Sequence, residues 1–274
     1  MRIVNLMENT PGVNGCACEH GLSIYVETKK HKLLVDTGAS GAFIDNAKKL
    51  GINLESVDTV ILSHGHYDHG GGISDFVKIN SQAKIYIRPS AFGNYYHKGH
   101  KSERYIGLKK ELESCEQMCL VEGNVTIDDE IFLFTNVTGR RLWPSGNLKL
   151  KKKISDEWLQ DDFDHEQYLI LSGDGKEVLI SGCAHNGILN ILDKAFELRG
   201  RVPDIVISGF HMMQKNGYSN EDMKIIRRTA EILKTYPTKF YTGHCTDRIP
   251  YEEMKNIMEE QLFYMHCGDS LNLG

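Results

Sequence analysis

Residues 59–72 read TVILSHGHYDHGGG, an apolar run followed at once by clustered histidine and aspartate. The run at 60–62 predicts a short buried strand, and the glycines behind it predict a turn. Imidazole and carboxylate are ligand types that zinc, iron and manganese accept. Four such groups at a strand end would repel one another when charged and would be costly to bury without a partner. We interpret the turn as a metal site, with these candidate ligands: His64, His66, Asp68 and His69.

The spacing inside the turn predicts two groups of ligands. His64 and His66 lie two positions apart, so in extended chain their side chains point the same way. Asp68 and His69 are adjacent and aim elsewhere. The arrangement therefore favours a site for two metal ions over one closed cage.

Bulk properties narrow the function classes. The chain has 274 residues, a formal charge of −5 and a pI near 6.2, which gives no global attraction to nucleic acid or to an anionic membrane. Seven cysteines, an odd number, do not form a secreted disulfide framework. No basic start with an apolar stretch precedes the first strand, and no apolar run approaches the ~20 residues of a membrane helix. We expect a soluble cytoplasmic protein whose partners are small molecules.

Other predicted strands also end in polar residues that could bind a metal or support its ligands. The hairpin at 22–35 ends at Asp36, which is either a turn-forming residue or an acceptor that orients a metal-bound histidine. The hairpin at 167–180 leads into SGCAHNG at 181–187, and a helix follows. Two later strands end in Gly-Phe-His and Gly-His. The candidates from these ends are Cys183, His185, His211 and His244.

The H-x-H-x-D-H pattern at 64–69 resembles the signature of the metallo-β-lactamase-fold superfamily. The stretches at 19–23, 181–187, 209–211 and 242–246 resemble a subgroup named for a dihydropterin-ribofuranosylaminobenzene phosphate synthase. The resemblance implies an α/β fold, a four-layer αββα sandwich of two mixed β-sheets with helices outside. It implies one domain over 1–274, with insertions at about 89–117 and 138–163.

The resemblance also implies a ligand set. One ion is assigned to His64, His66 and His185, the other to Asp68, His69 and His244, with Cys183 as an extra ligand or as an inert buried thiol. Asp36 then orients a ligand. His165 is the alternative to His185, and His185 is favoured because His165 stands among acidic residues that we expect to be exposed. Asp68 and His211 are the catalytic candidates, His211 for substrate contact or proton transfer.

The two insertions are read as substrate-contacting segments. The first mixes aromatic and basic residues before an expected helix at about 108–119, and is interpreted as a lid over a flat anionic substrate or as a homodimer surface. The second holds a basic stretch at 139–153, either a solvated loop or a set of cations for a phosphate or carboxylate. The substrate-binding candidates are His20, Tyr96 and Arg140.

The predicted reaction is hydrolysis by a metal-bound hydroxide at an ester or phosphoester of a small anionic substrate, pterin-like or nucleotide-like. We expect two divalent ions, zinc first, with manganese or iron as alternatives. The same ligands suit a diiron oxidoreductase. The subgroup name instead implies a transferase that joins a dihydropterin to a ribofuranosylaminobenzene phosphate, and a metal-binding module without catalysis is the remaining alternative.

Overall fold

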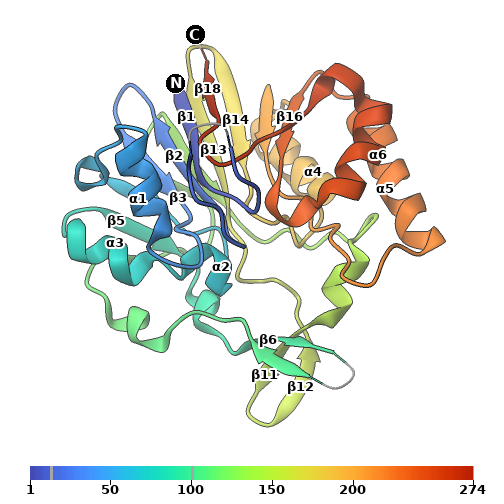
Figure 1. Cartoon of the computed structure of the whole chain (residues 1–274), viewed down its shortest axis with the longest axis horizontal. Helices are drawn as coiled ribbons and strands as arrows, with labels where there is room; N and C mark the ends of the chain where they lie inside the picture. Colours follow the sequence, from blue (N-terminus) through green and yellow to red (C-terminus); the bar gives the residue numbers. More distant parts are fainter. Residues whose placement is uncertain (13–14, 100–101, 274) are drawn as a thin grey trace.

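A computed structural model of the chain describes residues 1–12, 15–99 and 102–273. Two seven-stranded sheets lie face to face, and helices cover the outer face of each (Figure 1). The predicted four-layer αββα sandwich of mixed sheets is therefore confirmed. The division of the chain into one domain stays a prediction.

The first sheet has the strand order β18-β1-β2-β3-β4-β5-β8. It is antiparallel from β18 to β3 and parallel from β3 to β8. Parallel neighbours need crossover connections, which here contain the helices α1 (Ala42–Lys49) and α3 (Ile73–Ile79). Its strands are β1 (Arg2–Met7), β2 (Ser23–Glu27), β3 (Lys32–Val35), β4 (Thr59–Ile61), β5 (Lys84–Ile87), β8 (Met118–Leu120) and β18 (Ser270–Asn272).

The second sheet has the order β17-β16-β15-β14-β13-β10-β9. It too is half antiparallel, from β9 to β14, and half parallel, from β14 to β17. Its crossover helices are α4 (Ile188–Arg199), α5 (Asn220–Leu233) and α6 (Arg248–Met258). Its strands are β9 (Val125–Thr126), β10 (Ile131–Phe134), β13 (Tyr168–Gly173), β14 (Lys176–Ile180), β15 (Ile205–Ile207), β16 (Lys239–Thr242) and β17 (Leu262–Tyr264).

Alternation along the strands divides the apolar side chains among three cores. On β3, Leu34 packs outward in the cluster that contains Phe43 of α1, whereas Leu33 and Val35 point inward to the cluster between the sheets. On the second sheet, Leu179 packs in the cluster that contains the buried side chains of α4, α5 and α6. Burying each such side chain stabilises the fold by roughly 1.5–3 kcal/mol. The three cores hold the parallel strand ends of both sheets in fixed positions.

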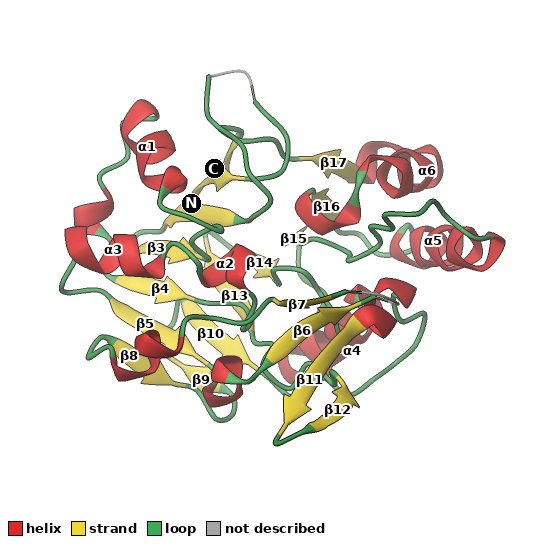
Figure 2. Cartoon of the chain, turned by 60° about the horizontal axis from the view of Figure 1, so that its bottom comes forward, coloured by secondary structure: helices red, strands yellow, loops and turns green. Residues whose placement is uncertain are grey.

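A third, four-stranded sheet comes from the two segments predicted as insertions. Its order is β12-β11-β6-β7, and all its pairs are antiparallel. Figure 2 shows it in front of the two large sheets, with β7 near α2 (Tyr67–Gly70). Its strands are β6 (Tyr95–Lys98), β7 (Glu103–Tyr105), β11 (Leu150–Ile154) and β12 (Glu157–Gln160).

Two local expectations were wrong. The lysines at 151–153 lie in β11 rather than in a loop, because β11 pairs with β6, a strand some fifty residues earlier that local sequence does not reveal. The helix expected at about 108–119 is a 3-10 helix, η3 (Lys110–Ser114), followed by the edge strand β8. Leu108 and Leu112 are both buried, so their helical spacing was satisfied by a single turn. Pairing with β5 then extends the chain.

Among the described residues, no helix combines the length and the apolar composition that crossing a bilayer requires.

Candidate metal centre

The parallel strands of both sheets end at one edge of the sandwich, and their following residues converge there. Asp36 follows β3, the 64–69 loop follows β4, and Cys183 follows β14. His211 comes after β15 and His244 after β16. The chain turns sharply at three of these points, where φ is 59° at Asp36, 49° at His211 and 50° at His244. Left-handed backbone at non-glycine residues is costly and gathers at functional sites.

Two buried groups of donor atoms meet at one thiol. His64, Cys183 and His185 offer three donor atoms that all lie within 4.8 Å of one another. His69, Cys183 and His244 form a second such group. Because Cys183 belongs to both, its Sγ lies between the two sets of imidazoles. These groups contain four of the six residues assigned to two ions, His64 with His185 and His69 with His244. The donor atom of His66 belongs to another group.

Four of the histidines are held by their Nδ1 atoms. A hydrogen bond at Nδ1 fixes the ring and leaves the Nε2 lone pair for a metal, which is the usual arrangement of metal-ligating histidine. The bonds are His64 Nδ1 to Ser63 Oγ at 2.9 Å, His69 Nδ1 to Asp36 Oδ2 at 2.6 Å, His185 Nδ1 to Asn147 Oδ1 at 3.0 Å and His244 Nδ1 to Asn9 Oδ1 at 2.8 Å. Asp36 also accepts from the backbone and hydroxyl of Ser63.

In the described part of the chain, four buried ring nitrogens make no hydrogen bond, and three of them are Nε2 atoms of the candidate ligands. The Nε2 atoms of His64, His66 and His185 are buried and make no hydrogen bond. Burial lowers the pKa of His66 to about 3 and lowers the pKa values of His64 and His185 well below the usual range. The three rings are therefore neutral at neutral pH. A neutral imidazole with an unused lone pair is the form that binds a metal, so these residues fit a divalent ion.

A carboxylate, that of Asp68, lies beside the second group. His244 Nε2 lies 3.5 Å from Asp68 Oδ2 and 3.2 Å from His69 Nε2, and His69 Nε2 lies 3.1 Å from Cys183 Sγ. Burial opposes protonation of His244, but the hydrogen bond to Asp68 and the charges of Cys245, Asp68 and Glu8 together raise the pKa of His244 to about 9. Burial raises the pKa of Asp68, yet the hydrogen bonds from His20 and His244 hold it well below its usual range. A divalent ion bound between His244 and Asp68 would take the place of the proton on His244.

His165 is not exposed as expected; its side chain is fully buried. The reasoning was wrong because Asp161, one of the neighbouring acidic residues, is itself buried and pairs with it: Asp161 Oδ2 lies 3.3 Å from His165 Nε2. His165 Nδ1 accepts the backbone N–H of Gly65 at 3.0 Å. Both ring nitrogens are thus engaged, whereas His185 Nε2 is unpartnered. Donor atoms of His66, Asp161 and His165 also lie within 4.8 Å of one another.

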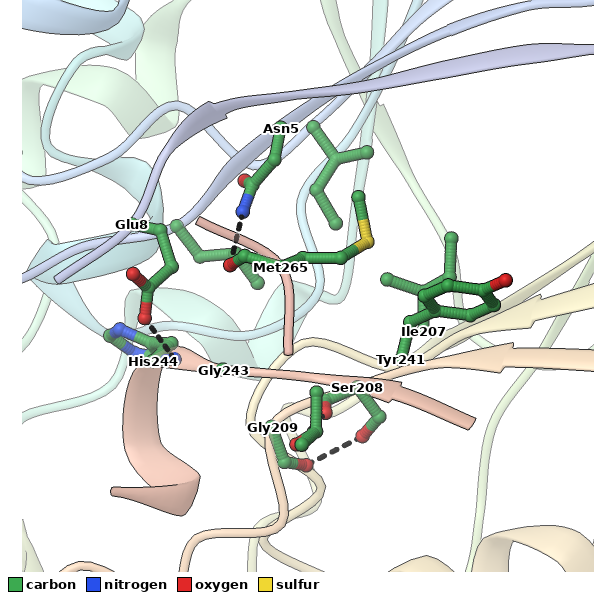
Figure 3. A pocket seen from close by; sticks show the side chains of 12 residues that line it. Asn5, Glu8, Ile207, Ser208, Gly209, Tyr241, Gly243, His244 and Met265 are labelled. Atoms are coloured by element: carbon green, nitrogen blue, oxygen red, sulfur yellow. Dashed lines mark hydrogen bonds between the residues drawn. The ribbon is translucent and has the colours of Figure 1, made fainter. Parts of the chain in front are cut away.

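Two buried glutamates hold the histidine-bearing loops, and the sequence reasoning missed both. Glu166 accepts the backbone N–H groups of His185 and Asn186 at 2.6 and 2.9 Å. Glu8 accepts the N–H of His244 at 2.5 Å, beside a small pocket between the sheets that Figure 3 shows. Glu8 could have been found, because it directly follows β1 in the same strand-end position as the other site residues. Glu166 follows several acidic residues, so its sequence context did not distinguish it.

The remaining candidates lie around this cluster. His20 is half-exposed, with Nε2 at 3.2 Å from Asp68 Oδ2. The His211 ring centroid lies 4.1 Å from that of His185, its Nδ1 is buried without a partner, and it groups with Cys183 and Cys245. These positions adjoin the two donor groups.

Two predicted substrate contacts have other neighbours. Tyr96 packs on Tyr105 and Trp158, on the opposite face of β6 from Tyr95, so it is not among the side chains brought together. Arg140 donates to Asn186 Oδ1 at 2.8 Å and to the carbonyl of Asp162 at 2.9 Å. It thus fastens the residue next to His185. The substrate-binding roles of both side chains stay predictions.

The comparisons with known proteins agree on one family. The family model described as the metallo-β-lactamase superfamily matches residues 17–187. A curated relative from Methanocaldococcus jannaschii, 7,8-dihydropterin-6-methyl-4-(β-D-ribofuranosyl)-aminobenzene-5'-phosphate synthase, is 27% identical over 98% of this chain and 95% of its own length.

Two solved structures show the same architecture. Tm1679, described as a metal-dependent hydrolase of the β-lactamase superfamily, superposes with a TM-score of 0.81 at 29% identity, covering 100% of this chain and 99% of that one. The metallo-β-lactamase fold protein YhfI from Bacillus subtilis has a TM-score of 0.57 at 14% identity, with 98% of each chain covered. The second likeness shows the fold alone.

Proposed function

Because the chain belongs to the metallo-β-lactamase superfamily, we propose that it is a metal-dependent hydrolase that cleaves an ester or phosphoester of a small anionic substrate. The observation that carries the proposal is the set of three buried, unpartnered Nε2 atoms of His64, His66 and His185. Burying polar atoms without a partner costs free energy, which a bound cation recovers. The likeness to Tm1679 supports the hydrolase class.

The donor set fits two divalent ions. His64, His66 and His185, whose ring centroids lie 4.6 to 4.9 Å apart, would hold one. Asp68, His69 and His244 would hold the other, with Cys183 available to both. Nitrogen, oxygen and thiolate donors together suit zinc first, with iron and manganese as alternatives. Bound divalent ions supply a coordinated water whose pKa is lowered towards about 7, and they polarise the bond to be cleaved.

Asp68 and His20 act as a pair in the proposed reaction. The Asn9 side-chain amide lies 3.3 Å from His20 Nδ1, so His20 presents its Nε2–H to Asp68 Oδ2. Asp68, which the hydrogen bonds from His20 and His244 keep ionised, orients the attacking water. His20, on the exposed side, passes a proton to the leaving group. His211 lies beside His185 and contacts the substrate from the other side.

Asn9 positions this pair and His244 together. Its Oδ1 accepts from His244 Nδ1 at 2.8 Å and from the Gly21 backbone at 3.3 Å, and its Nδ2 donates to the His244 carbonyl at 3.2 Å. One amide thus fixes the tautomer of His244 and the place of His20. Burial shields the imidazoles from bulk solvent, since His64, His66, His69, His185 and His244 are all less than 5% exposed.

The test is elemental analysis of the purified protein, followed by assays on bis(p-nitrophenyl) phosphate and on p-nitrophenyl esters. We expect about two zinc ions per chain and hydrolysis of one of these probes. His66→Ala should lose metal and activity while remaining folded. His31→Ala, an imidazole at the far end of β3, is the matched control and should keep both. Full metal content and activity in His66→Ala would refute the site.

A second candidate is the transferase reaction that the relative's name implies. The observation that favours it is the match to that synthase across 98% of this chain. A mixture of a dihydropterin with a ribofuranosylaminobenzene phosphate, followed by mass spectrometry, distinguishes the two reactions. A condensed product supports the transferase, and hydrolysis of a phosphoester probe without condensation supports the hydrolase.

A further inference from the structure

One face of the third sheet borders the histidine cluster. Tyr95 on β6 is buried, with its ring centroid 5.9 Å from that of His66 and 4.1 Å from that of His165. Side chains two apart on a strand share a face, so His97 lies on the same side of β6. Arg104 of β7 is the direct cross-strand partner of His97 and shares that face as well. The sheet therefore presents His97 and Arg104 next to the candidate metal centre.

Arg104 reaches the edge of the ligand loop itself. Its guanidinium carbon lies 5.6 Å from the ring centroid of Tyr67, the residue between His66 and Asp68. The side chain is exposed and therefore open to a ligand from solvent.

Two lysines belong to the segments 145–149 and 211–215, which contact each other. Lys149, at the end of the 3-10 helix η4 (Ser145–Lys149), has its Nζ 3.2 Å from Gln214 Oε1. Gly146 of the same helix lies against the 211–214 loop, close to the side chains of His211 and Gln214. Lys215 follows that loop and is exposed. His97 is the cross-strand partner of Arg104 and also of Leu150, the residue after Lys149, so strand pairing brings both cations to this imidazole. Lys215 follows Gln214, which accepts from Lys149. Burial lowers the pKa of His97, and the nearby charges of Lys215, Arg104 and Lys149 lower it further.

These cations differ from their basic neighbours in the absence of close ion pairs within the described residues. Within the described ranges 1–12, 15–99 and 102–273, Arg104, Lys149 and Lys215 have no carboxylate at ion-pair distance. Other basic residues of this part of the fold are paired: Lys152 with Asp162 at 2.7 Å, and Lys98 with Glu103 at 3.6 Å. The whole chain carries a formal charge of −5, so three cations without a close ion pair in its described part stand out against the overall charge.

We propose that Arg104, Lys149 and Lys215, gathered around His97, bind the terminal phosphate of a phosphomonoester substrate whose reacting bond lies at the histidine cluster. A phosphomonoester carries a charge of about −1.5 to −2 near neutral pH, which matches several cations better than a single carboxylate does. The planar fork of Arg104 suits two phosphate oxygens. The inference rests on the proposed function in taking the histidine cluster as the reaction centre. It assigns a recognition site that is separate from the metal ligands.

The test measures binding of ribose 5-phosphate, with ribose as the matched ligand, to the full-length metal-loaded protein by calorimetry. Arg104→Gln/Lys215→Gln should raise the Kd of ribose 5-phosphate roughly tenfold or more and leave ribose unaffected. Lys149→Gln provides a second variant. Lys176→Gln/Lys239→Gln removes the same charge at the other ends of β14 and β16 and should change the Kd less than about twofold. Circular dichroism checks that each variant is folded.

Two outcomes would overturn the proposal. Equal Kd values in the wild-type protein and in Arg104→Gln/Lys215→Gln would place the phosphate on bound metal instead of on this face. Absence of binding to the wild-type protein at about 10 mM ligand would also refute it. Repeating the titration in His66→Ala separates this inference from the proposed function. Binding that persists there and still depends on Arg104 supports the phosphate site even if no hydrolysis is found.

Discussion

The carboxylate of Glu166 accepts the backbone N–H of His185, with 2.6 Å between Oε1 and the nitrogen. The same carboxylate accepts the backbone and side-chain N–H groups of Asn186 and the hydroxyl of Tyr168, between 2.7 and 2.9 Å. A buried acceptor with four donors around it holds the loop after β14 in one conformation. The place of His185 therefore depends on a residue that does not itself contact the candidate ions.

Glu166→Gln should destabilise the protein and weaken metal binding. An amide in place of the carboxylate turns an NH₂ group towards N–H or O–H donors, which leaves buried polar groups unpaired at a cost of about 2–3 kcal/mol. Metal affinity should fall by about tenfold to a hundredfold, because the support of a ligand is lost. Urea unfolding and chelator competition measure the two effects. Glu197→Gln, an exposed glutamate, should change neither; equal behaviour of the two variants would contradict the role of Glu166.

His185→Ala should lower the metal content more than His165→Ala does. The unpartnered Nε2 of His185 faces the cluster, whereas both ring nitrogens of His165 are engaged by Gly65 and Asp161. His165→Ala should instead reduce thermal stability, since it leaves the buried carboxylate of Asp161 without its imidazole partner. Plasma mass spectrometry gives the ions per chain for both variants. Metal loss confined to His165→Ala would assign the ligand to His165.

Cys183→Ala should weaken the binding of both ions by more than about tenfold, because its Sγ belongs to both donor groups. Titration with a competing chelator measures the two affinities. Cys115→Ala, a half-buried thiol away from the cluster, is the control. If Cys183 were only a packing residue, the substitution would lower the unfolding free energy but leave both metal affinities unchanged.

His31 should make stability depend on pH. Burial opposes its protonation, but hydrogen bonds from Nε2 to Asp128 and from Nδ1 to Asp58, both 2.8 Å, raise the pKa of His31. A raised folded-state pKa stabilises the protein below the unfolded value of about 6.5, and the effect is lost as the pH rises through the folded-state pKa. His31→Gln should therefore cost about 1 kcal/mol near pH 5.5 and less near pH 9.

Urea unfolding of the wild-type protein and His31→Gln at the two pH values measures this difference. Asp128→Asn removes one of the two partners and should reduce the pH dependence without abolishing it. A constant cost of His31→Gln across the range would show that the ring acts by packing alone.

Much of the architecture could be predicted from local sequence because strand ends are marked by composition. The run at 60–62 and its ligand-rich turn, the hairpin that ends at Asp36, and the 181–187 stretch each combine apolar residues, glycine and a polar donor. Parallel strands bring such ends to one edge of a sheet. The fold class and the gathering of the candidate residues follow from that pattern. The resemblance to the family supplied the assignment of donors to ions, which stays a prediction.

Local sequence did not show which side chains fill the space between these ends. His165 looked exposed because its neighbours are acidic, yet Asp161 is buried with it and occupies one of its nitrogens. The third sheet pairs β6 with β11 across some fifty residues, so the lysines of β11 gave no local sign of a strand. Glu166 acts through backbone N–H groups, which leave no residue pattern. Glu8 does so too, and only its place after β1 marked it.

The sequence by itself determined the kind of chemistry, because ligand types and strand-end spacing are local properties of the chain. Only the tertiary structure decided which nitrogens are unpartnered, which thiol lies between both groups, and which cations stand unpaired beside them. Those properties depend on distances between residues that are far apart in the sequence, such as His69 and His244, whose Nε2 atoms lie 3.2 Å apart. Packing of the three apolar cores sets these distances, and no single segment encodes them.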